Sequence, residues 1–216
     1  MRPLFITLTL LTNIACAQWE VSPEKKLCIK ISPFHLIDPW DGTACKIGAE
    51  FKIHEKISEY LEYGRYFPQL TIWGSLENNK GFTAKAETRM YWNPKEKNSR
   101  SYVSIELLYI DQSYARSDSI EIKPIPRYNK KYSLSKKVIG LYANIGQTGI
   151  YKRRLIIEGF IGLGVRFKNV TCTLTQEEAD HRNFGDWNNP DSWVNKCGKF
   201  ITPDFNFGIL IGYKIL

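Results

Sequence analysis

The chain has 216 residues, with 30 Lys and Arg against 22 Asp and Glu and a formal net charge of +8. This length suits one domain, and neither a Ser/Gly-rich or Pro-rich linker nor a repeat of about 20–50 residues divides it. Because both signs of charge are interspersed and no long basic run occurs, we expect no nucleic-acid partner.

The first 17 residues have the pattern of a secretory signal peptide. Arg2 gives a positive start, residues 4–11 form a short apolar core, and Ala15-Cys16-Ala17 is a small-residue cleavage site. We therefore expect residues 1–17 to be removed and residues 18–216 to form the mature domain. A lipidated Cys16 is the alternative, although the residues before it lack the leucine expected upstream.

After the signal peptide, no stretch reaches ~18 consecutive apolar residues, which excludes membrane-spanning helices. Short segments instead alternate apolar and polar residues with the period of two that a β-strand imposes. Eight strands are predicted in chain order, at residues 27–31, 46–53, 57–66, 82–92, 103–109, 139–146, 155–167 and 205–215. The pattern of the third segment is irregular, and we expect a β-bulge there.

The predicted connections alternate between short and long. Short turns are expected at residues 54–56, 93–100 and 149–153, and long loops at residues 35–43, 67–80, 111–136 and 171–199. Outer-membrane barrels have short periplasmic turns and longer external loops. If the predicted strands form such a barrel, we expect the N-terminus on the periplasmic side.

The two faces of the predicted strands differ in character. One face is continuously apolar, as in Phe205, Phe207 and Ile209, whereas the other mixes charge with glycine, as in Lys46, Gly48 and Glu50. Glycine weakens a solvated strand, but inside a narrow barrel it makes room for a large side chain opposite. We therefore predict an all-β fold, a single closed antiparallel transmembrane β-barrel of about eight strands with its polar face inward. A soluble lipocalin-like barrel, with the apolar face inward, is the alternative.

Three segments carry a resemblance to a known group of proteins. They are Ala15-Cys16-Ala17-Gln18, the glycine-rich strand from Gly159 to Arg166, and the ending from Pro203 to Leu216. Together they resemble small outer-membrane β-barrels of the OmpA/OmpX/OmpW-like group, over nearly all of the mature chain. The resemblance implies a location in the outer membrane of a Gram-negative bacterium, contact with outer-membrane lipid, and insertion by the barrel-assembly machinery. The chain departs from the pattern by ending on Leu216 rather than on an aromatic residue.

Charged side chains gather on the predicted inward face. Lys30 and Lys52 are two of them, and nine others form a candidate network. In a tube of low dielectric constant, opposite charges pair and form hydrogen bonds. One interpretation is the lining of a selective pore, and the other is a salt-bridged plug, since about eight strands leave room only for side chains. The candidate network comprises Lys46, Glu50, Lys85, Glu87, Arg89, Glu106, Glu158, Arg166 and Lys214.

Four cysteines remain in the mature chain, and export permits disulfides among them. Cys172 and Cys197 bracket one polar loop and are the candidate pair, and the loop between them carries Trp187 and Trp193 as candidate recognition residues. Cys28 is predicted to point inward and Cys45 outward. Either both are free, or the predicted register slips by one residue at the first hairpin.

No catalytic motif appears among the G-x-S-x-G, H-E-x-x-H and P-loop patterns. The three histidines, His35, His54 and His181, fall in predicted turns and loops without a recognised metal-ligand spacing. We therefore predict no catalytic, cofactor-binding or metal site. The leading hypothesis is a non-enzymatic outer-membrane barrel with a plugged lumen and structural or ligand-binding external loops. A narrow channel for small or apolar solutes, a lipid-modifying barrel enzyme and a soluble ligand binder are the alternatives.

Overall fold

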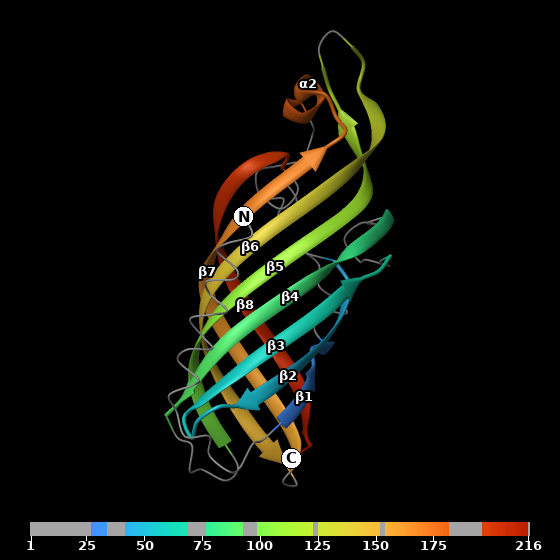
Figure 1. The fold of residues 1–216 in the computed structure, drawn as a ribbon. Coiled ribbons are helices and arrows are strands. Elements are labelled where there is room, and N and C mark those ends of the chain that lie inside the picture. The colour runs from blue at the N-terminus through green and yellow to red at the C-terminus, as the bar shows by residue number, and fades with distance from the viewer. Residues whose placement is uncertain are drawn as a thin grey trace, which may run out of the picture.

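The computed structural model describes residues 27–33, 42–68, 77–92, 99–122, 125–151, 154–181 and 196–215. The predicted signal peptide and Cys16 lie outside these ranges. Eight strands pair in sequence order as a closed antiparallel barrel, with the last strand returning to the first. The strands lean across the barrel in Figure 1. Their bounds are β1 Leu27–Ile31, β2 Ala44–Lys52, β3 Ile57–Tyr66, β4 Glu77–Tyr91, β5 Ser99–Ile120, β6 Tyr128–Tyr151, β7 Leu155–Cys172 and β8 Gly198–Lys214.

The register of the strands fixes the stagger of the barrel. Starting at Ile29 in β1, one can move from each residue to its cross-strand partner on the next strand. After β7, this path arrives at Pro203 in β8. Across the closing seam, however, Ile29 pairs with Tyr213, which lies ten residues further along β8. A stagger of this size over eight strands tilts them by roughly 35–45° and gives an interior that side chains fill.

The prediction of a polar interior is confirmed. Inward positions hold buried charges such as Lys30, Arg89 and Glu158, whereas Ile105 and Leu163 on the outer wall are 65% and 68% exposed. In water, an apolar outer wall of this extent would be strongly unfavourable, whereas lipid tails solvate it well. The soluble barrel alternative requires the opposite arrangement.

The predicted bulge in the third segment is wrong. β3 pairs residue for residue with β2 and with β4, and the irregularity lies instead between Glu77 and Lys80 in β4. The sequence pattern misleads because Glu59 and Arg65 lie on the outer face of β3 while Tyr60 and Tyr66 point inward. Regular geometry therefore underlies an irregular apolar pattern.

The predicted loop at residues 111–136 is also wrong in extent. β5 continues to Ile120 and β6 begins at Tyr128, so these two strands rise well beyond β1–β4 (Figure 1). Most of their outward residues in this part are polar or small, as in Ser113, Ala115 and Ser133, so the apolar alternation stops before the strands do. We call the parts of β5 and β6 that lie beyond Asp111 and Lys137, the end of β7 and α2 (Gln176–Asp180) the extension.

The closing seam between β1 and β8 is short. Pairing runs only from Cys28 with Lys214 to Ile31 with Ile211. Pro33 follows closely and cannot donate a backbone hydrogen bond, which limits continuation of β1. By contrast, β5 and β6 pair along their whole length, from Ser99 with Gly149 to Ile120 with Tyr128. Within the described ranges, no helix has the length and apolar character needed to cross a bilayer.

Candidate functional site: an ion-paired lumen

Glu158 of β7 lies at the centre of the lumen and is completely buried. Its carboxylate accepts hydrogen bonds from Lys30 Nζ, from Arg89 Nη1 at 3.0 Å and from Tyr102 Oη at 2.7 Å. The donors come from β1, β4 and β5, so one carboxylate ties three other strands together. Because a buried charge is tolerated only when paired and hydrogen-bonded, these donors are what allow Glu158 to occupy this position.

A second carboxylate completes the bridge across the lumen. Glu50 of β2 lies 2.5 Å from Lys30 Nζ and 3.2 Å from Arg89 Nη1. It also accepts hydrogen bonds from Ser58 and Tyr91 hydroxyls, both at 2.6 Å. Lys30 and Arg89 are therefore shared between Glu50 and Glu158, which project from different parts of the barrel wall.

The network continues along the barrel axis. Glu87 accepts from Arg89 Nη2 at 2.7 Å and from Ser104 at 2.6 Å. Lys85 Nζ lies 3.8 Å from Glu87 and 3.5 Å from Glu106. Asn144 and Asn206 donate to Glu106 at 2.9 and 3.1 Å, which brings in β6 and β8.

Aromatic rings fill the space between these charges. The Arg89 guanidinium lies 4.5 Å from the centre of the Tyr60 ring and 4.7 Å from that of Tyr102. Lys85 Nζ lies 5.1 Å from the Tyr60 ring and 5.0 Å from the Phe160 ring. Cation–π contacts of this kind are strongest where water is excluded, and the rings also occupy the volume through which a solute would pass.

Glycines on adjacent strands receive these rings, as predicted. A Cβ at residue 146 would overlap the Tyr102 ring, and a Cβ at residue 208 would lie 2.8 Å from the Phe160 ring. Tyr102 and Phe160 are the direct cross-strand partners of these two glycines. The rings therefore lie flat along the wall, where the Tyr102 hydroxyl reaches Glu158 and the Phe160 ring contacts Lys85.

Arg166 belongs to a separate group, which lies nearer the end of the barrel that carries the extension. Its Nε lies 2.7 Å from Asp204, and Tyr142 Oη donates to the same carboxylate at 2.7 Å. The side chains of Arg166 and Asp204 are 15% and 22% exposed, so this group is more accessible than the central one.

The structure brings at least six of the nine charges predicted for the network together. Glu50, Lys85, Glu87, Arg89, Glu106 and Glu158 join one cluster with Lys30. Lys46 is buried and inward, whereas Lys214 is half-buried at the turn end opposite Cys28, outside this cluster. Glu62, buried and bonded to Tyr60 at 2.8 Å, was missed because its strand lacked a clear pattern.

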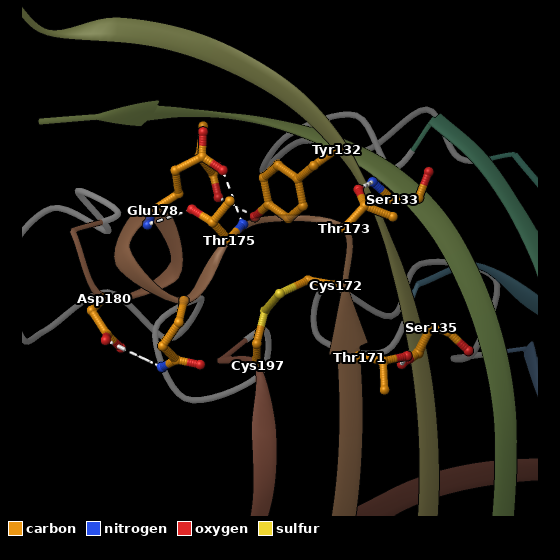
Figure 2. The surroundings of a disulfide bond; sticks show 12 residues. Tyr132, Ser133, Ser135, Thr171, Cys172, Thr173, Thr175, Glu178, Asp180 and Cys197 are labelled. Carbon is orange, nitrogen blue, oxygen red and sulfur yellow. Dashed lines mark hydrogen bonds between the residues drawn. A yellow bond between two sulfur atoms is a disulfide. The ribbon is translucent and has the colours of Figure 1, made fainter. Parts of the chain in front are cut away.

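The predicted disulfide is present at the base of the extension. Cys172 and Cys197 are joined, with Cα atoms 6.0 Å apart (Figure 2). They pack against a small apolar cluster that includes Tyr132, Leu134 and Val170. Cys28 is buried and Cys45 is exposed, and both thiols are free. Cys28 therefore points inward and Cys45 outward, as predicted, and the register of the first hairpin does not slip. Trp187 and Trp193 lie outside the described residues.

The helix α2 is attached to the extension by Glu178. Thr175 caps the helix, and Figure 2 shows the reciprocal bonds between its side chain and backbone and Glu178. The Glu178 carboxylate also accepts from Lys130 Nζ at 2.5 Å and Tyr128 Oη at 3.1 Å. These bonds, with that from Lys130 the strongest, lower the pKa of Glu178 from 4.5 to about 2.

Two solved structures are similar to this chain at low identity. The N-terminal β-barrel domain of Pseudomonas aeruginosa OprF shares 10% identity over 88% of this chain and 97% of that chain, with a TM-score of 0.39. Acinetobacter baumannii CarO2 shares 11% identity over 88% and 96% of the two chains, with a TM-score of 0.41. No family model and no curated protein matches the sequence. The resemblance to small outer-membrane barrels is confirmed for the fold by the ring of eight antiparallel strands.

Proposed function

We propose that this chain is an integral outer-membrane β-barrel without catalytic activity, whose lumen is closed by paired charges and whose external extension serves a structural or binding role. The observation that carries the closed lumen is the bridge of Lys30 and Arg89 between Glu50 and Glu158. All four side chains are at least largely buried, and aromatic rings fill the space around them.

The membrane location is supported by the two surfaces of the wall. Charges face inward and pair with one another, while aliphatic and aromatic side chains face outward on all eight strands. A bilayer requires each backbone polar group to be satisfied within the protein, which a closed barrel achieves. The predicted export signal and the resemblance to outer-membrane barrels favour the outer rather than the inner membrane. Insertion by the barrel-assembly machinery is part of this proposal.

The orientation follows from the unequal ends of the barrel. At one end, β2 and β3 are joined by the short turn around His54, and β1 begins beside the end of β8. At the other end are the extension and α2 (Figure 1). We place the short-turn end in the periplasm and the extension outside the cell, which is the usual asymmetry of such barrels.

The two described histidines lie too far apart to act together in one site. His54 lies in the short turn and His181 at the end of α2, at opposite ends of the barrel. Across the described ranges, no group of three or more His, Cys, Asp or Glu side chains is arranged to hold a metal ion.

Planar-bilayer recording tests the closed lumen. Purified wild-type protein is expected to give no reproducible conductance, because the central side chains leave no continuous aqueous path. The double substitution Arg89→Ala and Glu158→Ala removes both members of the central pair and is expected to produce discrete conductance steps. Glu59→Ala, which removes a carboxylate from the outer wall, is the control and should stay silent.

Each protein is first shown to be folded by its change in gel mobility on heating. Regular conductance steps from the folded wild-type protein would overturn the closed lumen and favour the narrow channel. Recovery of the wild-type protein from the periplasm without detergent would overturn the membrane location itself.

A further inference from the structure

Three aromatic rings lie side by side on the outer wall of β3, β4 and β5. The ring centres of Tyr63 and Phe82 are 6.0 Å apart with planes 20° from parallel, and those of Phe82 and Tyr109 are 5.7 Å apart. Tyr63 is 53% exposed, so the group faces the surroundings of the barrel rather than its core. We call these three residues the aromatic platform.

Two cations adjoin the aromatic platform on the same face. Arg65 is the next outward residue after Tyr63 and the direct cross-strand partner of Phe82. Lys80 is the next outward residue beyond Phe82 on β4. Diagonal neighbours on one face of a sheet lie roughly 7–8 Å apart, a separation that two long side chains can close around one anion.

The neighbouring lysines on this face form ion pairs with carboxylates. Lys137 lies 3.6 Å from Asp111, and Lys131 pairs with Glu77. Within the described residues, Arg65 and Lys80 are exposed and form no ion pair. Because Lys137 pairs with Asp111, which is the cross-strand partner of Phe82, the cations Arg65 and Lys80 add positive charge beside the aromatic platform.

The position along the barrel matches the edge of a bilayer. On β5 the outward residue after Tyr109 is Asp111, and on β6 the outward residue before Ile139 is Lys137. The apolar wall therefore ends beside the aromatic platform, on the side of the extension. Tyrosine rings favour this level, where an apolar body meets a polar tip.

We propose that Arg65, Lys80 and the aromatic platform bind a phosphorylated glycolipid of the outer leaflet. The two cations contact a phosphate of its headgroup, and the rings pack against its acyl chains. A guanidinium and an ammonium provide charge-assisted hydrogen bonds to phosphate. The proposal rests on the outer-membrane location argued above, because that location places the extension side of the barrel in the outer leaflet.

Native mass spectrometry of the purified, folded protein tests this site, with bisphosphorylated lipid A as the probe. The test variant is Arg65→Gln with Lys80→Gln. The control is Lys56→Gln with Lys199→Gln, which removes the same charge from the short turn and from the loop end of β8. The test variant is expected to retain lipid A about tenfold less than the wild type, as removal of charged hydrogen-bond donors implies, while the control retains it fully.

Dephosphorylated lipid A and phosphatidylglycerol serve as comparison lipids, and both are expected to be retained weakly. Equal retention of lipid A by the test variant and the wild type would overturn the site. Retention of dephosphorylated lipid A equal to that of lipid A would overturn the phosphate contact, and equally strong retention of phosphatidylglycerol would overturn the choice of a glycolipid. A wild-type protein that shows no heat-dependent mobility would instead count against the barrel function, so the two failures are distinguishable.

Discussion

Single glycines decide how the aromatic side chains fit inside the lumen. Gly146 lies directly under the Tyr102 ring, whose hydroxyl is held by Glu158 and whose face contacts Arg89. Gly159 lies on the outer wall of the next strand, β7, and has open space where a Cβ would be. The two glycines therefore differ in what surrounds them, although both lie within continuous strands.

Substitution of these glycines tests this difference. Gly146→Ala is expected to destabilise the barrel by about 1–3 kcal/mol, because the added methyl group displaces a ring that is fixed at both its tip and its face. Gly159→Ala is expected to be neutral or slightly stabilising, since it only restricts the unfolded chain. Urea unfolding in lipid vesicles measures both free energies, and an equal effect of the two substitutions would contradict the ring-packing account.

The members of the ion-pair network could be predicted from the sequence, but their partners could not. Alternation along each strand places a residue inside or outside, which was enough to identify Glu50, Arg89 and Glu158. Pairing depends on which strands lie opposite one another and on their stagger, so Arg166 joins Asp204 rather than the central cluster. Glu62 shows the other limit, because a strand without a clear pattern does not reveal its inward residues.

At the scale of elements, strand existence was predictable and strand length was not. Apolar alternation identifies the part of β5 and β6 that would face lipid, and it stops where Asp111 and Lys137 replace apolar residues on the outer face. The strands nevertheless continue because inward residues such as Tyr114, Tyr132 and Leu134 form a core of their own above that level. The alternation of apolar and polar residues identifies only strand segments whose outer face is apolar, so it does not reveal segments whose outer face is polar.

The attachment of α2 to the extension is expected to depend on pH through Glu178. Since the pKa of this carboxylate is lowered to about 2, its bonds to Lys130 and Thr175 stabilise the attached helix fully above about pH 4.5. That stabilisation should be lost progressively as the pH falls from 4.5 towards 2. The backbone amide of Thr175, which donates to Glu178 at 3.0 Å, provides an NMR signal for the titration.

Glu178→Gln is the matched control for this titration, because it removes the charge and keeps the shape of the side chain. The variant should show no transition in the Thr175 amide between pH 4.5 and 2. A wild-type midpoint near pH 4.5 would show that the carboxylate gains nothing from its neighbours, contrary to the proposed attachment.

For the molecule as a whole, the eight-stranded closed architecture was predictable and the way it closes was not. The number of alternating segments and the inward polarity follow from the residues themselves. The ten-residue stagger and the short seam follow from pairing between Ile29 and Tyr213, which lie far apart in the sequence. Contacts between such distant residues leave no trace in a local pattern.

The short seam also determines the order in which the wall can assemble. β5, β6 and β7 are joined by local connections and pair over long stretches, whereas β1 must find β8 after almost the whole chain has been placed. Bringing distant residues together costs loop entropy before any contact rewards it. We therefore expect the hairpins to form early and the seam to close last.

Cys28 provides a built-in reporter of that last event. It lies in β1, and Gly212 of β8 packs so closely against it that a Cβ there would lie 3.1 Å from the thiol sulfur. During refolding of residues 18–216 carrying Cys45→Ser and an intact Cys172–Cys197 disulfide, protection of Cys28 from a maleimide pulse should lag behind the β-sheet signal in circular dichroism. Simultaneous appearance of the two signals would contradict late closure. If closure is late, a half-assembled chain is an open sheet with two free edges. The last hydrogen bonds to form are then those between β1 and β8.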